Sequence, residues 1–297
     1  MNLDKLVRYA LDKDRFLTIE DYLDFPKHFL EFIKENLQAV IVSKNENHYR
    51  FFQYKKDGSY NVTRPINSEL LYSLEDFIRL SDVFLKVIDS IREDDLGTKE
   101  NREVINRVIY SAQQSIGACL DALPANRSNT ARKLNGDLFE RFIRLIIERC
   151  GVDVTEGTIR IPVEVNGEKA FDMRYQHDLI LTADEETKAI GSVKTSSKDR
   201  LDKVFVDKFL YNRLTGKSTP HFAIFLNDVQ RKGKEGKFGI NATFLPGHFK
   251  GYTVKLNPLD GVYYCDIRPN MKTEPILKDH IKTFDHFIFS DMWKFVD

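Results

Sequence analysis

The stretch YQHDLILTADEETKAIGSVKTSSKDRLDKVFVDKF, residues 175–209, decides the fold of this chain. The apolar run LILT leads into the polar turn Asp184-Glu185-Glu186, and KAIGSVK then returns as a second run of strand-forming residues. Two such runs separated by a short polar turn predict an antiparallel hairpin. The hairpin brings a carboxylate, Asp178, and an ammonium group, Lys194, to the same end of two neighbouring strands.

Further elements are expected on both sides of this hairpin. Strands are predicted at 158–165, 170–182 and 188–194, then a helix from about Leu201 to Leu214, and finally the strands HFAIFL, INATFL and YTVKL. Before them, a helix capped by Ser128 or Asn129 and ended by Gly151 is predicted by an apolar stripe of Leu134, Leu138, Phe142, Leu145 and Ile146. This order of elements predicts an α/β fold with helices packed on a sheet.

The first part of the chain has a different pattern. Helical periodicity recurs in DKLVRYALDK, in IEDYLDFPKHFLEFIKENL, from Ser68 to about Arg92 and from Asn101 to about Ala122. A short hairpin is expected at about 38–63, with Asp57-Gly58 as its turn. We therefore predict two domains that meet near Pro124: a mostly helical one at 1–123 and an α/β one at 124–297.

Composition limits the class of protein without identifying it. With 42% apolar and 30% charged residues, 297 residues can bury a sizeable core. Lys plus Arg equal Asp plus Glu at 45 each, so any affinity for a polyanion must come from a local patch. The three cysteines lack metal-type spacing and cannot form a complete disulfide framework, and neither a signal peptide nor a run of roughly 20 apolar residues is present. A cytoplasmic protein is expected.

The residue types in the 175–209 stretch suit phosphodiester hydrolysis. That reaction uses a divalent cation to neutralise charge and activate water, and a cationic side chain beside the water or the phosphate assists it. Asp178 and Lys194 supply the two kinds of group. Other chemistries lack their patterns: there is no HExxH zinc motif, no Walker-type phosphate loop and no nucleophile elbow for a serine.

The hairpin resembles the PD-(D/E)XK nuclease superfamily, whose signature is an Asp on one strand and an acid-x-Lys on the next. Here that second motif is Ser192-Val193-Lys194, so Ser192 stands where an acid is usual. The type II restriction endonucleases that cut CCGG and CCNGG sites tolerate this change, with the acid moved to the following helix. The resemblance implies Asp207 as that acid, with Asp202 as the weaker alternative.

The resemblance implies two further groups of site residues. Glu140, on the helix after Pro124, matches the superfamily's supporting acid, and Lys198-Asp199-Arg200 matches a motif that recognises bases. Arg or Lys donates to guanine O6 and N7, and Asp accepts from the cytosine N4 amine in the major groove. The segment 188–217 carries eight basic and three acidic residues, which favours contact with phosphates.

The sequence therefore predicts a PD-(D/E)XK restriction-endonuclease-like core, with a mixed central sheet flanked by helices. The expected enzyme cuts double-stranded DNA at a short palindromic C/G-rich site, depends on Mg²⁺ and leaves 5′-phosphates. Homodimerisation follows from the palindrome, and a cognate DNA methyltransferase is expected as a functional partner. Residues 1–123 would serve as a DNA-contacting or dimerisation arm. The expected catalytic residues are Asp178, Lys194, Asp207, Glu140 and Ser192, with Asp178, Asp207 and Glu140 as metal ligands.

Alternatives remain open at this stage. Asp207 with Lys203, and Glu140 with Arg144, are spaced as ordinary helical ion pairs. The superfamily also includes repair and recombination nucleases, and a DNA-binding protein with a decayed site is a third interpretation. Tyr49, Phe51, Phe52 and Tyr54 fit either a surface that stacks extruded bases or, as we prefer, a half-buried strand.

Overall fold

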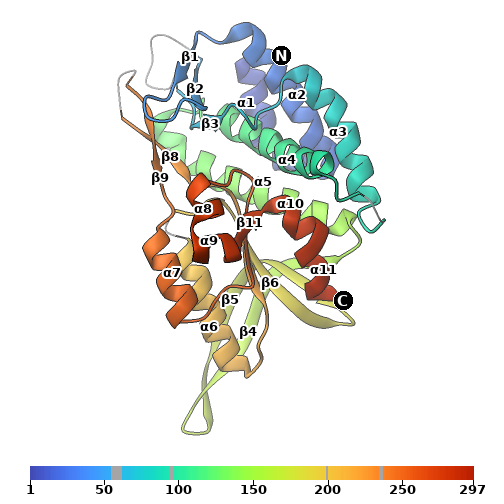
Figure 1. Cartoon of the computed structure of the whole chain (residues 1–297), viewed down its shortest axis with the longest axis vertical. Helices are drawn as coiled ribbons and strands as arrows, with labels where there is room; N and C mark the ends of the chain where they lie inside the picture. Colours follow the sequence, from blue (N-terminus) through green and yellow to red (C-terminus); the bar gives the residue numbers. More distant parts are fainter. Residues whose placement is uncertain (55–61, 94–95, 199, 234–236) are drawn as a thin grey trace.

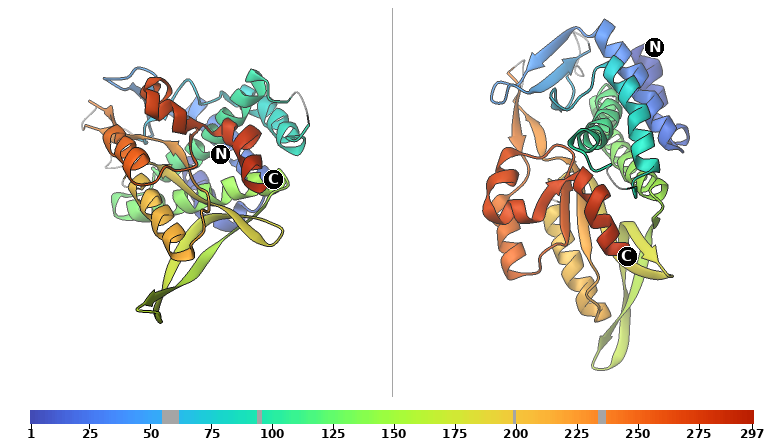
Figure 2. Two further views of the ribbon diagram at one scale, coloured as in Figure 1. Left: turned by 60° about the horizontal axis from the view of Figure 1, so that its bottom comes forward. Right: turned by 45° about the vertical axis from the view of Figure 1, so that its right-hand side comes forward.

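The computed structural model describes residues 1–54, 62–93, 96–198, 200–233 and 237–297. The amino-terminal helices lie at one end of the molecule and a six-stranded sheet at the other, and a long hairpin extends away from the helices (Figure 1). Two further views show the helix α5, Ser128–Arg149, between the helical layer and the sheet (Figure 2). The sheet is mixed and has helices on its faces, so the predicted fold class is confirmed.

The four helices predicted in the first part of the chain are present. Each helix is preceded by an N-cap residue whose side chain accepts a hydrogen bond from a backbone N–H of the first turn. At the start of α2, Thr18 and Asp21 cap each other in a full capping box. The helices are α1 (Leu3–Leu11), α2 (Ile19–Asn36), α3 (Leu74–Asp89) and α4 (Lys99–Leu120). Between α2 and α3 lies a small sheet of β1 (Ala39–Val42), β2 (Tyr49–Gln53) and β3 (Ile66–Asn67). The predicted Asp57-Gly58 turn lies outside the described residues.

The central sheet has the strand order β11-β10-β7-β6-β5-β4. The hairpins β4–β5 and β5–β6 are antiparallel, whereas β6, β7, β10 and β11 run parallel to one another. Their bounds are β4 (Asp153–Val165), β5 (Glu168–Ala183), β6 (Glu186–Ser196), β7 (His221–Asn227), β10 (Gly261–Tyr264) and β11 (Ile281–Thr283). The hairpin predicted from residues 175–209 thus supplies two inner strands of the sheet, which lie between β7 and β4.

Two cores cover the two faces of this sheet. The larger one joins α2, α4 and α5 to the sheet residues Leu179, Val193 and Phe222, so it contains residues from both halves of the chain. The smaller one lies under α6 (Leu201–Thr215) and α7 (Pro246–Lys255). The remaining elements are η1 (Lys13–Arg15), η2 (Ala125–Arg127), α8 (Pro269–Thr273), α9 (Pro275–His280), α10 (Phe284–His286), the π-helical turn η3 (Phe287–Asp291) and α11 (Met292–Val296).

Two local predictions are wrong, and a third is confirmed only in part. The segment YTVKL, 252–256, was expected as a strand but lies at the end of helix α7, because Pro246 begins a helix whose Phe249 and Thr253, four residues apart, face the core. INATFL supplies only the strand β9 (Gly239–Ala242), which pairs with β8 (Val229–Lys232) in a separate ribbon. Neither Ser128 nor Asn129 caps α5, whose N-cap residue is Arg127.

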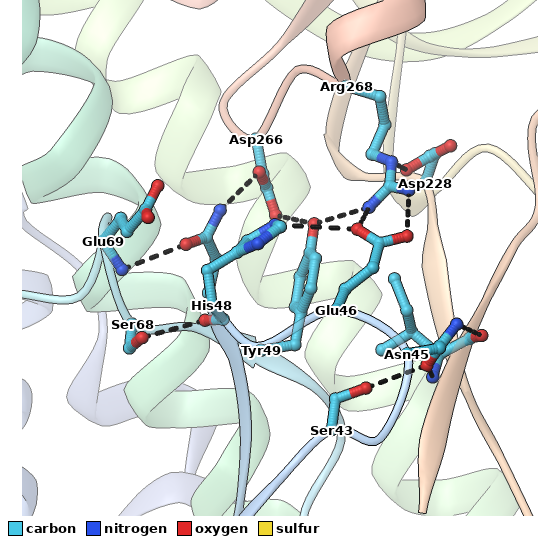
Figure 3. A network of polar contacts seen from close by, with 12 residues as sticks. Ser43, Asn45, Glu46, His48, Tyr49, Ser68, Glu69, Asp228, Asp266 and Arg268 are labelled. Carbon is cyan, nitrogen blue, oxygen red and sulfur yellow. Dashed lines mark hydrogen bonds and ion pairs between the residues drawn. The ribbon is translucent and has the colours of Figure 1, made fainter.

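A buried polar network joins the small amino-terminal sheet to the ends of the parallel strands (Figure 3). The Tyr49 hydroxyl donates to Asp266 at 2.8 Å, and the Asn67 amide donates to the other oxygen of the same carboxylate at 2.9 Å. Arg268 donates to both oxygens of Glu46, at 2.5 and 2.6 Å, and its Nε lies 3.7 Å from Asp228. These contacts fix the position of the first part of the chain on the sheet.

The three cysteines are buried and free. No helix among the described residues is both long enough and apolar enough to cross a membrane.

Candidate active site

The site begins at an irregularity in β5. Between Thr155 and Gly157 the strand β4 advances by two residues, while β5 advances by three, from Ile180 to His177. The extra residue is a β-bulge at Asp178 and Leu179. A bulge changes the direction of the side chains beside it: His177 packs against Tyr211 of α6, whereas Leu179 belongs to the larger core. Asp178 therefore lies where the regular strand is interrupted.

The two strands of the hairpin also separate at this point. Pairing of β5 with β6 runs from Ala183 to Leu179, which is opposite Gly191, while β6 continues beside β7 as far as Ser196. Past Gly191 the backbone N–H of Val193 donates to the Asp178 carboxylate at 2.9 Å in place of a ladder bond. The Asp178 side chain thus occupies the place where the two strands diverge.

Lys194 brings two carboxylates together at this divergence. Its Nζ donates to Asp178 Oδ2 at 2.6 Å and to Glu140 Oε1 at 2.7 Å. Glu140 comes from α5, whose buried residues include Leu138, Phe139 and Phe142 and hold the helix against the sheet. The three side chains are half-buried, with exposed fractions of 14% for Asp178, 24% for Glu140 and 28% for Lys194. They are accessible without being fully solvated.

Charges in this group depend on one another. Burial, reinforced by the Asp178 carboxylate, raises the pKa of Glu140 above its ordinary value despite the Lys194 ammonium. Burial alone would lower the pKa of Lys194, but the two carboxylates outweigh it and the pKa is raised. Lys194 is therefore an ammonium ion at neutral pH, held between two oxygens.

The donor set suits a hard divalent cation. Asp178 and Glu140 already converge on a cation, the Lys194 ammonium, at hydrogen-bond distance. Mg²⁺ prefers carboxylate oxygens and is held by one or two of them together with water and phosphate. Among the described residues, no group of three or more His, Cys, Asp or Glu side chains is arranged to hold a metal. The pair Asp178 and Glu140 thus fits an ion that takes its other ligands from water and substrate.

The other two expected catalytic residues lie differently. Asp207 pairs with Lys203 at 2.5 Å, one helical turn earlier on α6. It is near enough to act electrostatically on His177, whose pKa burial lowers while Asp207 and Asp178 oppose that effect, but no contact with Lys194 or Glu140 is found. Ser192 lies on β6 opposite Ala223 of β7, two residues before Lys194. The structure brings together Asp178, Lys194 and Glu140, whereas Asp207 pairs with Lys203 on α6.

A cleft of about 940 Å³ opens next to the three residues. Glu140 and Lys194 line it from the sheet side, and Arg64 and Asp121 line it from the first part of the chain. Seven lining residues are basic and three are acidic, in a chain whose net charge is zero. The basic ones are Arg64, Arg132, Lys133, Lys194, Lys198, Arg200 and Arg231. A local excess of positive charge next to the carboxylates of Asp178 and Glu140 suits a polyanionic substrate.

The predicted base-recognition motif falls on this cleft. Lys198 and Arg200 both line it, whereas Asp199 lies outside the described residues. Within the described part of the chain no ion pair neutralises Lys198, Arg200, Arg132 or Lys133. Their charges are available to a ligand.

The alternative of a base-stacking surface at residues 49–54 is not supported. Tyr49, Phe51, Phe52 and Tyr54 are all buried, with at most 6% of each residue exposed. The Tyr49 and Tyr54 hydroxyls donate to Asp266 and to the Ala118 carbonyl. The preferred interpretation, a half-buried strand, is confirmed in that residues 49–53 form a strand, but its aromatic side chains are buried on both faces, Phe52 in the larger core and Tyr49 and Phe51 in a separate one.

Sequence reasoning missed several residues of the cleft. Arg132 and Lys133 lie near the start of helix α5, a position that favours contact with phosphates and is readable from the sequence. Arg64 and Gln230 carry no local signal, whereas Arg231 begins the basic loop RKGKEGK, 231–237, which the sequence leaves open as either solvated or in contact with phosphates. These three residues reach the cleft only because the chain folds back on itself.

These features define an α/β fold with a charged cleft at the point where two strands of the sheet separate. The crystal structure of the type IIP restriction endonuclease Kpn2I matches it with a TM-score of 0.72 and 18% sequence identity, over 99% of this chain and 97% of that one. A PspGI–substrate DNA complex gives a TM-score of 0.41 at 12% identity, over 73% and 92% of the two chains. Metal-depleted Ecl18kI with uncleaved, modified DNA gives 0.35 at 12% identity, over 100% and 81%.

No protein-family model matches the chain, and no curated protein matches its sequence. The likeness to Kpn2I extends over nearly the whole of both chains, so this chain shares the fold of a restriction endonuclease from the amino-terminal helices to the last strand.

Proposed function

We propose that this protein is a type II site-specific deoxyribonuclease, which hydrolyses phosphodiester bonds of double-stranded DNA with Mg²⁺. The observation that carries the proposal is the convergence of Asp178 and Glu140 on Lys194, at the edge of a basic cleft. The fold shared with a type IIP restriction endonuclease supports it. The proposed site is a short palindrome with a C/G-rich core of the CCGG or CCNGG type, and cleavage leaves 5′-phosphates.

Each residue of the site has a chemical task in this proposal. Asp178 and Glu140 hold the cation, with Asp207 as the further ligand that the resemblance implies. Bound Mg²⁺ neutralises charge on the scissile phosphate and activates the attacking water. Lys194 uses two of its three donors on the carboxylates, which leaves the third to orient water or a phosphate oxygen. The half-buried position of these groups strengthens their electrostatic effect on the reacting phosphate.

Recognition of the DNA falls to the walls of the cleft. Lys198 and Arg200 donate to guanines, Asp199 accepts from cytosine, and the basic residues at the start of α5 contact phosphates. A palindrome presents the same bases on both strands, so two copies of the chain related by a two-fold axis recognise and cut it. We propose a homodimer, protected in the cell by a cognate methyltransferase.

The test is digestion of unmethylated phage DNA with and without Mg²⁺, by the wild type and by Asp178→Ala. We expect discrete fragments whose ends share one C/G-rich palindrome and carry 5′-phosphates, and no fragments without metal or with the variant. Cleavage that depends on branched or damaged DNA would assign the site to a repair nuclease. Binding without cleavage would leave a DNA-binding protein.

A further inference from the structure

The ribbon of β8 and β9 carries two opposed amide side chains that the proposed function leaves unused. Gln230 of β8 lies directly opposite Asn241 of β9 in an antiparallel register. Within the described part of the chain, neither side chain forms a hydrogen bond. Gln230 is half-buried and lines the cleft, whereas Asn241 is exposed and does not.

The other face of the ribbon is anchored. Val229 and Ile240 pack against Tyr49 and Phe51 in a small separate core. The Asn45 side chain donates to the Ile240 carbonyl at 3.0 Å and accepts from its N–H at 2.9 Å, which imitates a strand pairing. The face of the ribbon that carries Val229 and Ile240 is therefore held on the amino-terminal sheet. Successive side chains of a strand point to opposite faces, so Gln230, which follows Val229, faces away from that sheet.

The base of the ribbon is tied to the segment that leads to Lys198 and Arg200. The Thr243 hydroxyl donates to the Asp228 carbonyl at 2.7 Å and lies 3.3 Å from Ser196 Oγ and 3.2 Å from Ser197 Oγ. Gln230, Lys198 and Arg200 line the same cleft. The ribbon of β8 and β9, labelled in Figure 1, thus shares the cleft with Lys198 and Arg200 and is held at its base beside Ser196 and Ser197.

From this arrangement we propose that the β8–β9 ribbon is a second base-recognition element, in which the Gln230 amide recognises an adenine beside the C/G-rich core. The inference rests on the proposed function. A two-stranded ribbon fits the major groove, and a glutamine amide pairs with adenine N6 and N7 through one donor and one acceptor. The unpaired amide in the cleft has both groups free for this purpose. The site accordingly has at least one A·T pair on each side of its core.

The experiment separates binding from cleavage. Duplexes with random positions around the core are selected on the protein without divalent metal, and the bound pool is sequenced for the wild type, Gln230→Ala, Gln230→Glu and Asn241→Ala. We expect the wild type to enrich adenine at one flanking position and Gln230→Ala to lose that preference by about 10- to 100-fold, with the core preference unchanged. Asn241→Ala, the matched amide outside the cleft, retains the wild-type pool.

The Gln230→Glu variant sharpens the test, because a carboxylate accepts from cytosine N4 and cannot donate to adenine N7. Its preference should move from adenine towards cytosine at the same position. The inference is overturned if Gln230→Ala keeps every flanking preference or weakens binding equally at all sequences. A selected pool without cleavage when Mg²⁺ is added would count against the proposed function and leave the role of Gln230 intact.

Discussion

Lys194 is the residue on which the proposed chemistry of this site depends. Among the described ion pairs, Lys194 is the one cation that contacts both Asp178 and Glu140. The two carboxylates raise the pKa of Lys194, although burial opposes this effect. A side chain with this role cannot be replaced by an apolar one of similar length without loss of both charge and hydrogen bonds.

We expect Lys194→Met to slow DNA cleavage by roughly 100- to 10,000-fold, the range found when an electrostatic or proton-transfer group is removed. Lys188→Met is the matched control, since Lys188 is on the same strand and, among the described residues, forms its one ion pair with Glu186 at 3.3 Å. The rate is measured under single-turnover conditions on one plasmid site. Equal rates for the two variants would remove Lys194 from the mechanism.

Asp207 and Asp202 can be separated by their own substitutions. Both are on α6, where Asp207 pairs with Lys203 and Asp202 lies 3.5 Å from His248. Only Asp207 acts electrostatically on His177, the neighbour of Asp178. We expect Asp207→Asn to slow cleavage about 10-fold or more and to raise the Mg²⁺ concentration required, and Asp202→Asn to do neither. A metal titration of initial rates decides between them, and an inert Asp207→Asn leaves Asp178 and Glu140 as the complete ligand pair.

At the scale of elements, the pairing of β6 with β7 depends on a glycine at position 191. A Cβ atom on Gly191 would lie 2.5 Å from the Phe222 ring, which is itself packed against Phe287 and Phe295. Since Gly191 lies opposite Phe222 in the register of β6 and β7, a side chain at residue 191 would force this ring to shift.

We expect Gly191→Ala to lower the free energy of unfolding by about 1 to 3 kcal/mol, the usual cost of overpacking a core. Gly136→Ala is the opposite case, because nothing lies within 4 Å of its Cβ in helix α5, and it should stabilise by about 0.5 to 1 kcal/mol. Urea denaturation of the two variants tests both signs. A neutral Gly191→Ala would show that Phe222 can move.

The element scale also explains which predictions about the hairpin were confirmed. Alternation and the polar turn placed β5 and β6 correctly, yet nothing in the residues from Tyr175 to Leu181 indicated the bulge. A bulge arises from the pairing of β5 with β4, whose register is a property of two strands together. For the same reason YTVKL was misplaced: its β-branched residues favour a strand, but its contacts place it in a helix.

At the scale of the whole molecule, the polar network of Figure 3 connects the first part of the chain to the sheet. Asp228 is 2% exposed, and its Oδ1 has no hydrogen-bond partner among the described residues. Burial raises its pKa to about 7, with Asp266 and Glu46 adding to the effect and Arg268 opposing it. The ionised form is therefore disfavoured in the folded protein.

Stability should consequently depend on pH through this residue. Between the ordinary pKa of about 3.9 and a folded value of about 7, the folded state binds more protons than the unfolded state, so stability decreases as pH rises through this window. Asp228→Asn removes the charge, and we expect it to be more stable than the wild type at pH 8, on the order of 2 kcal/mol, and equal to it near pH 4. Thermal unfolding at several pH values, without DNA, measures the difference. A constant difference across the range would contradict the titration of Asp228.

Part of this protein was determined by the sequence alone. The hairpin with Asp178 and Lys194, the helix with Glu140 and the helical first part follow from periodicity and turn residues, which act over a few positions. The resemblance added Lys198 and Arg200, which line the cleft.

The rest was decided by tertiary structure. Glu140 and Lys194 are 54 positions apart, and their hydrogen bond forms only because α5 packs on the sheet. The cleft likewise depends on the tertiary fold, because its lining includes residues from distant parts of the chain, such as Arg64 and Gln230. The charge state of a buried group also depends on the tertiary fold. The pKa of Asp228 is set by its burial and by Arg268, Asp266 and Glu46, which are distant from it in the sequence or become its neighbours only on folding. Short-range patterns specify elements because their energies are local, whereas sites and charge states depend on groups that become neighbours only when the core forms.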